Sequence, residues 1–122
     1  MNLQILPQAF TVCQVTGITT VDFTRAFVFL TKTDDELSLV CETEFVPANT
    51  IAREDGWRGV RVCGVLDFSL VGILAKISGL LAEQGISIFA VSTYNTDYIF
   101  TKAEVFDRAL DALSRAGYAI LE

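Results

Sequence analysis

The pattern of apolar and polar positions is most regular between residues 57 and 122. Residues 58–65 (RGVRVCGV) are rich in β-branched side chains, which predicts a strand. The next segment, residues 70–84, repeats its apolar positions at helical spacing and predicts a helix that ends before Gly85. The apolar positions of this helix are Leu70, Ile73, Leu74, Ile77, Leu80 and Leu81.

Two further strands and a second helix complete this half of the chain. Residues 86–93 and 97–103 are predicted strands, and the polar residues between them predict a hairpin turn. Residues 104–116 predict a helix with one apolar face, and YAIL at 118–121 predicts a last strand. The order β-α-β-β-α-β predicts an α+β fold in which two helices cover one face of an antiparallel sheet.

The first half of the chain predicts strands and no long helix. FTVCQV, AFVFLTKT and LSLVCETEF have strand character, whereas GITTVDF and PANTIARED are too short or too polar for long helices. FVFLTKTDDELSLV can be aligned with FAVSTYNTDYIFTK at a constant offset of 62, which suggests a degenerate repeat. The alignment pairs Phe27 with Phe89, Thr31 with Thr93, Asp35 with Asp97 and Leu37 with Ile99. We therefore expect a helix-poor lobe at residues 1–56 and a complete lobe at residues 57–122.

Composition and charge narrow the classes of partner. The 122 residues are 52% hydrophobic, but no window has the roughly 18 uncharged apolar residues that a membrane span needs. The first ten residues, MNLQILPQAF, also lack the basic region of a signal peptide. Fifteen acidic against nine basic residues give a net charge of −6, which disfavours nucleic acid and anionic lipid as partners. These features predict a soluble cytoplasmic protein.

The chemistry available for catalysis is poor. The chain contains no histidine, the commonest general base and metal ligand. Cys13, Cys41 and Cys63 lie in apolar strand-like runs without a CxxC pair, which predicts buried reduced thiols. Cys41 or Cys63 would be the best candidate nucleophile of an enzyme, yet neither has a histidine to activate it. We therefore expect no enzymatic activity, no metal and no cofactor.

The segment GVLDFSLVGIL, residues 64–74, places polar residues where a strand ends and a helix begins. Asp67 or Ser69 could simply be the N-cap of the helix, and Gly72 could let the helix approach the sheet. The same helix start could also bind a carboxylate through its free N–H groups, with Asp67 beside it for an ammonium group. A ligand with both charges, such as an α-amino acid, suits this site better than a phosphate, which Asp67 would repel.

A second polar cluster, residues 92–97 (STYNTD), lies at the tip of the predicted hairpin. Because Asn, Thr and Asp are common turn formers, an ordinary turn explains this cluster without any binding role. In the first lobe the corresponding tip contains Asp34, Asp35 and Glu36, which we interpret as solvated.

The stretch GVLDFSLVGILAKISGLLAEQGISIFAVSTYNTDYIFTK resembles the ACT domain family, in particular small proteins with two ACT-like lobes. About 65 residues carry this resemblance strongly, and the first 56 carry it more loosely through TDDELSLVCE. The resemblance implies a ferredoxin-like βαββαβ fold, lobes that pair side by side or across a dimer, and small-molecule binding near the first strand and helix. The site residues that it implies are Asp67, Phe68, Ser69, Leu70, Gly72, Ile88, Ser92, Thr93 and Asp97.

Two functions remain after these arguments. The first is a non-enzymatic regulatory module that binds an amino acid or a similar small zwitterion. The second is a dimerisation or interaction module without a ligand, which the apolar composition and aromatic residues such as Phe27 and Phe89 would serve. Because one lobe cannot bury so many apolar residues well, we expect a homodimer or a higher assembly in either case.

Overall fold

The computed structural model describes residues 1–66 and 71–122 of the chain. These residues form two compact units, one made of residues 1–7 and 58–122 and the other of residues 8–57. We call them the helical unit and the helix-poor unit. Residues 1–7 therefore lie with the second half of the chain, whereas the division of the sequence at residue 56 grouped them with the first lobe.

Two long strands run from one unit into the other along the chain. They are β1 (Asn2–Val15) and β4 (Thr50–Val62). The helical unit then continues with α1 (Ile73–Glu83), β5 (Ile88–Ser92), β6 (Asp97–Lys102), a short 3-10 turn (Ala103–Val105), α2 (Phe106–Arg115) and β7 (Ala119–Leu121). This order follows the strand and helix order that the sequence predicts for residues 57–122.

The sheet of the helical unit has the strand order β7-β1-β4-β6-β5. β5 and β6 form an antiparallel hairpin, whereas β7 pairs in parallel with the first residues of β1, so that Leu3 lies beside Ile120. β1 therefore separates β4 from β7. The sequence pattern indicates no strand at residues 1–7, so the place of β1 between β4 and β7 was not predicted.

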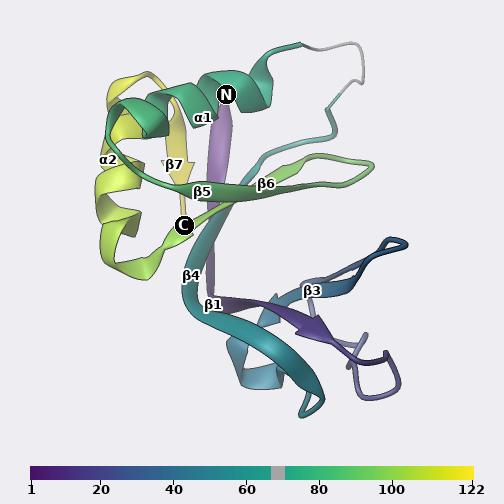
Figure 1. Cartoon of the computed structure of the whole chain (residues 1–122). Helices are drawn as coiled ribbons and strands as arrows, with labels where there is room; N and C mark the ends of the chain where they lie inside the picture. The colour runs from purple at the N-terminus through teal and green to yellow at the C-terminus, as the bar shows by residue number, and fades with distance from the viewer. Residues whose placement is uncertain (67–70) are drawn as a thin grey trace. The chain divides into compact units, whose positions relative to one another are not determined.

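The two helices pack together over one face of this sheet (Figure 1). The core of the unit contains buried residues from both helices and from the strands beneath them. They include Leu3, Val60, Val62 and Ile99 from the sheet, Ile77 and Leu81 from α1, and Phe106, Ala109 and Leu113 from α2. The i, i+4 and i, i+7 spacing of these helical residues explains why one face of each helix is buried.

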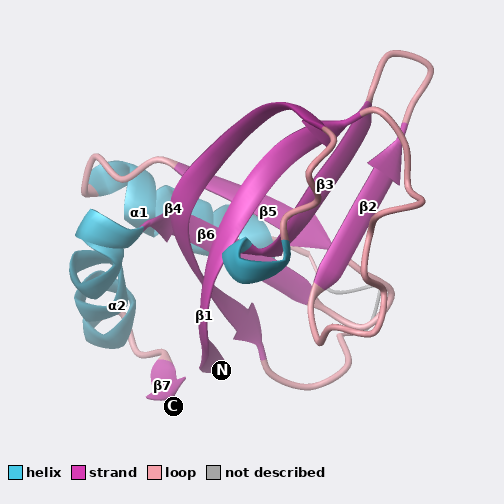
Figure 2. Cartoon of the chain, turned by 90° about the horizontal axis from the view of Figure 1, so that it is seen from below, coloured by secondary structure: helices cyan, strands magenta, loops and turns pink. Residues whose placement is uncertain are grey.

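The helix-poor unit contains the later part of β1, the strands β2 (Val28–Lys32) and β3 (Leu37–Glu42), a 3-10 turn (Thr43–Phe45) and the first residues of β4. β3 pairs antiparallel with both β2 and β1 (Figure 2). Its core is small and includes the buried pairs Cys13 and Val15 from β1 and Leu39 and Cys41 from β3.

The two hairpins repeat one another, but at an offset of 60 rather than the 62 of the sequence alignment. Val28 pairs with Cys41 in the first hairpin and Ile88 with Thr101 in the second. The turns agree, because Thr33 N–H donates to Glu36 O at 3.0 Å and Thr93 N–H donates to Thr96 O at 2.9 Å. The sequence pairing of Asp35 with Asp97 is therefore wrong.

The shift of two residues matters for the chemistry of the first hairpin. At the corrected offset, Asp97 corresponds to Leu37 and Ser92 corresponds to Lys32. The first hairpin therefore has no carboxylate at the position of Asp97.

Candidate functional site

The start of α1 is built around Gly72. This glycine is the N-cap residue, with φ 78° and ψ 4°, and its carbonyl accepts a 2.9 Å hydrogen bond from Lys76 N–H. The prediction that Asp67 or Ser69 is the N-cap is therefore wrong. The predicted role of Gly72 is also corrected, since a Cβ atom there would meet nothing within 4 Å, and it is the left-handed backbone that favours glycine.

The first turn of α1 presents backbone N–H groups to its surroundings. The first N–H groups of any helix have no partner within the helix, and the helix dipole makes this end attractive to anions. The first turn of α1 carries no acidic residue. The polarity of this end therefore suits a carboxylate.

The hairpin between β5 and β6 supplies the opposite side of the site. Ser92 and Asp97 are cross-strand neighbours at the end of the two strands, and the Ser92 hydroxyl donates a 2.6 Å hydrogen bond to Asp97 Oδ1. Both lie on the face of the sheet that carries Ile99, which belongs to the core beneath the helices. The pair is thus directed to the same side of the sheet as α1.

The hairpin turn is anchored to the rest of the unit by two hydrogen bonds. Thr96 is 7% exposed, and its hydroxyl donates to Val62 O at 2.6 Å. Leu66 N–H donates to Asn95 O at 2.7 Å. These bonds tie the turn to the end of β4 and to Leu66, which follows it.

A cleft of about 330 Å³ lies between the start of α1 and this turn. It brings together four residues that the sequence predicts for the site, Gly72, Ser92, Thr93 and Asp97. Ile88 does not line the cleft and packs against the core instead. The remaining predicted residues, Asp67, Phe68, Ser69 and Leu70, lie outside the described residues.

Sequence reasoning missed several residues of the cleft. They are Leu66, Ile73, Leu74, Ala75, Tyr94, Asn95 and Thr96. The polar turn residues had been noted as a cluster, but nothing in the sequence distinguished those facing α1 from those facing solvent. Ile73, Leu74 and Ala75 would follow from a correct helix start at residue 73.

The cysteines give no sign of a reactive thiol. Cys41 is 4% exposed, and burial raises its pKa to about 12, with the neighbouring Cys13 acting in the same direction. Burial also raises the pKa of Cys13.

Within residues 1–66 and 71–122, no three His, Cys, Asp or Glu side chains are grouped as a metal site would require. In the same residues, neither helix has the length and apolar character needed to cross a membrane.

Comparison with known families identifies the family to which the chain belongs. The family model of the ACT domain matches residues 52–115, so the chain belongs to the ACT domain family. A second model, of an N-terminal domain, matches residues 9–49. No curated protein matches the chain.

Solved structures share the fold over nearly the whole chain. A protein of Agrobacterium tumefaciens is 29% identical, with a TM-score of 0.87 over 98% of this chain and 91% of that one. A structure of aspartokinase alpha and beta subunits is 18% identical, with a TM-score of 0.66 over 95% and 97%. The regulatory subunit of aspartate kinase from Thermus thermophilus, in ligand-free form, is 14% identical, with a TM-score of 0.65 over 96% and 97%.

Proposed function

We propose that this ACT-domain protein is a non-enzymatic regulatory module that binds a free amino acid in the cleft between α1 and the β5–β6 hairpin. The observation that carries the proposal is the placement of the α1 N-terminus and the Ser92–Asp97 pair on one cleft of about 330 Å³. The N-terminus of α1 favours a negative group, and the hairpin contributes the carboxylate of Asp97. This arrangement matches the two charges of a zwitterion.

In this proposal the α-carboxylate of the ligand accepts hydrogen bonds from the first turn of α1. The α-ammonium is held by Asp97, whose orientation Ser92 fixes by its 2.6 Å hydrogen bond. Asp67, which lies outside the described residues, is a second candidate for the ammonium partner, as the sequence analysis proposed.

We further propose that residues 8–57 are a degenerate ACT-like lobe without a ligand site of this kind. Its hairpin repeats that of the helical unit at an offset of 60, which supports a common origin. Lys32 and Leu37 replace the Ser92–Asp97 pair, and the described residues between β1 and β2 contain no helix whose N-terminus could bind a carboxylate. The location in the cytoplasm stays a prediction.

Exposed apolar residues favour the alternative function, a dimerisation module. Val65, Val71 and Tyr94 are 71%, 90% and 79% exposed. Tyr94 lines the cleft, and the two valines are next in sequence to lining residues. Apolar side chains with this exposure are common at protein interfaces. A homodimer is compatible with either function, and so only a binding experiment separates them.

The test is thermal denaturation of the protein against each of the twenty amino acids. A ligand at 100 times its dissociation constant adds about 2.7 kcal/mol to the free energy of unfolding, which gives a clear rise in melting temperature. If no amino acid raises the melting temperature, the ligand-free dimerisation module is the better function.

Charge-neutralising variants then test the ammonium partner. Asp97→Asn should abolish the shift, since asparagine keeps the shape of the side chain but cannot pair with a cation. Asp35→Asn is the matched control, because it removes a turn carboxylate from the other hairpin and should leave the shift unchanged. If Asp97→Asn keeps the shift and Asp67→Asn abolishes it, Asp67 is the ammonium partner instead.

A further inference from the structure

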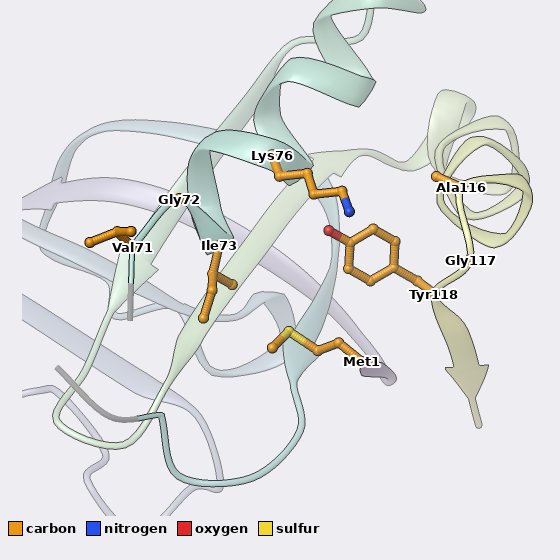
Figure 3. Close-up of a pocket in the computed structure, with 8 residues that line it drawn as sticks. All are labelled: Met1, Val71, Gly72, Ile73, Lys76, Ala116, Gly117 and Tyr118. Atoms are coloured by element: carbon orange, nitrogen blue, oxygen red, sulfur yellow. The ribbon is translucent and has the colours of Figure 1, made fainter. Parts of the chain in front are cut away.

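A second cavity of about 240 Å³ lies on the other side of the α1 start, against the segment that follows α2. Its walls include the side chains of Met1, Ile73, Lys76 and Tyr118 and the backbone at Gly117, as Figure 3 shows. All of these residues belong to the helical unit. Gly72 and Ile73 line both cavities, but none of the hairpin residues of the first cleft lines this one.

Tyr118 brings a hydroxyl group on a buried ring to this cavity. Its side chain is 8% exposed, and its ring packs in the core of the unit. The hydroxyl points into the cavity towards Lys76 (Figure 3), and within the described residues it has no hydrogen-bond partner. The ring is buried while the hydroxyl opens onto the cavity, so a ligand or water in the cavity can complete its hydrogen bonding. Burial raises the pKa of Tyr118, so the phenol stays protonated and can donate.

Lys76 brings a positive charge to the same cavity. It lies in the first turn of α1, and its Nζ is 5.8 Å from the centre of the Tyr118 ring. In the described part of the chain it forms no ion pair, although the protein carries a net charge of −6. A cation in the first turn of a helix is unfavourably placed relative to the helix dipole. An anion bound in the cavity would pair with the Lys76 ammonium and would offset its unfavourable position at this end of the helix.

The remaining side chains at the cavity are apolar. The side chains of Met1 and Ile73 line the cavity, and no acidic residue lies among the described residues that line it. An ammonium group therefore finds no carboxylate among the described residues of this cavity, in contrast to the cleft that contains Asp97.

We propose that this cavity is a second ligand site, for a small monocarboxylate with a short apolar tail. The carboxylate is held by the Lys76 ammonium and the Tyr118 hydroxyl, and the tail contacts Met1 and Ile73. The site selects against free amino acids, because they carry an ammonium group that it cannot pair. The inference does not depend on amino-acid binding in the first cleft.

The test uses isovalerate as the probe and amide chemical shifts of the isotopically labelled protein as the readout. Isovalerate should produce saturable shifts at Gly117 and Tyr118, which line only this cavity, while the amides of Thr93 and Thr96 stay unchanged. Isovaleramide, which has the same shape without the charge, and acetate, which lacks the tail, should each bind at least about tenfold more weakly.

Two conservative variants test which side chains bind the carboxylate of the probe. Lys76→Gln should weaken isovalerate binding about tenfold or more, and Tyr118→Phe, which keeps the buried ring, should weaken it about fivefold. Lys32→Gln removes an exposed lysine from β2 and is the matched control, with no expected change. Circular dichroism confirms that each variant is folded.

Three results would overturn the proposal. They are the absence of saturable shifts at Gly117 and Tyr118, equal binding of isovalerate and isovaleramide, and unchanged binding by both Lys76→Gln and Tyr118→Phe. Shifts at Thr93 and Thr96 in place of Gly117 would also overturn it, since the probe would then occupy the first cleft. Failure of amino-acid binding in the melting experiment leaves this proposal unaffected, because the amide shifts at Gly117 and Tyr118 report isovalerate binding directly.

Discussion

A Cβ atom on Gly59 of β4 would lie 2.7 Å from Cε1 of Phe100 on β6. Phe100 is fully buried, and its ring stacks on Phe89 with the ring centres 4.7 Å apart and an interplanar angle of 12°. The ring therefore has little room to move away. A glycine at residue 59 allows β4 to pass beneath this aromatic pair.

We expect Gly59→Ala to lower the free energy of unfolding by about 1–3 kcal/mol, because the added methyl group overpacks a closed site. The measurement is urea denaturation followed by circular dichroism. Gly79→Ala is the control, since a Cβ atom at this position of α1 meets nothing within 4 Å. There alanine should raise stability by up to about 1 kcal/mol. Equal effects of the two substitutions would contradict the steric explanation.

The position of the elements along the chain was largely predictable from sequence, whereas their register was not. The hairpin offset was wrong by two residues because strand side chains alternate with a period of two, so a shift of two keeps every residue on the same face. Three matched residues, Phe27, Thr31 and Asp35, then favoured the incorrect alignment. Turn hydrogen bonds, which fix the true offset, cannot be read from hydrophobic pattern.

The polar half of β4 was missed for a different reason. Residues 51–56 are all exposed and contain two acidic residues and one arginine, so they lack the alternation that predicts a strand.

The helix start was misplaced because Asp67 and Ser69 match N-cap preference, whereas the true N-cap, Gly72, is determined by its backbone angles. Ser92, Thr93 and Asp97, which line the cleft, were named through the resemblance to the ACT domain family, because the composition of the hairpin alone indicated an ordinary turn.

Burial of the cysteines predicts their reactivity. At pH 8 a thiol reagent should modify Cys63, which is partly exposed, while Cys13 and Cys41 react only after unfolding. Mass spectrometry of the native and the urea-unfolded protein after labelling gives the site of each modification. Rapid native labelling of Cys41 would show that the helix-poor unit opens easily.

The raised pKa of Cys41 also predicts how stability changes with pH. The folded value is about 12 against an ordinary value of 9.0, so above pH 9 the unfolded state loses its thiol proton while the folded state keeps it. Stability is therefore fully present below pH 9 and falls as the pH rises towards 12. Cys41→Val should reduce the slope of this decrease in urea denaturation experiments, and an unchanged slope would assign the decrease to other groups.

The buried hydroxyl of Thr96 should hold the shape of the first cleft. Thr96→Val keeps the volume of the side chain but leaves Val62 O without the 2.6 Å hydrogen bond, which should cost about 1–3 kcal/mol of stability. Thr96→Ser retains the hydroxyl and should cost less. In the same pair of variants, amino-acid affinity should fall with valine and persist with serine, as measured by calorimetry. Equal affinities would show that the anchoring bond does not position the hairpin for binding.

Gly72 is the N-cap residue of α1 and lines both cavities. Its φ of 78° is a left-handed conformation, so substitutions at this position test whether backbone conformation or space requires glycine. Gly72→Ala forces a Cβ atom into a left-handed conformation at a cost of about 1–2 kcal/mol, although no neighbouring atom obstructs it. Asparagine tolerates this conformation better than alanine, so Gly72→Asn should be the more stable variant despite its larger side chain. A steric explanation predicts the reverse order, with the smaller alanine more stable. Thermal denaturation of the two variants decides between these explanations, and greater stability of Gly72→Ala would show that space rather than backbone conformation requires glycine at the start of α1.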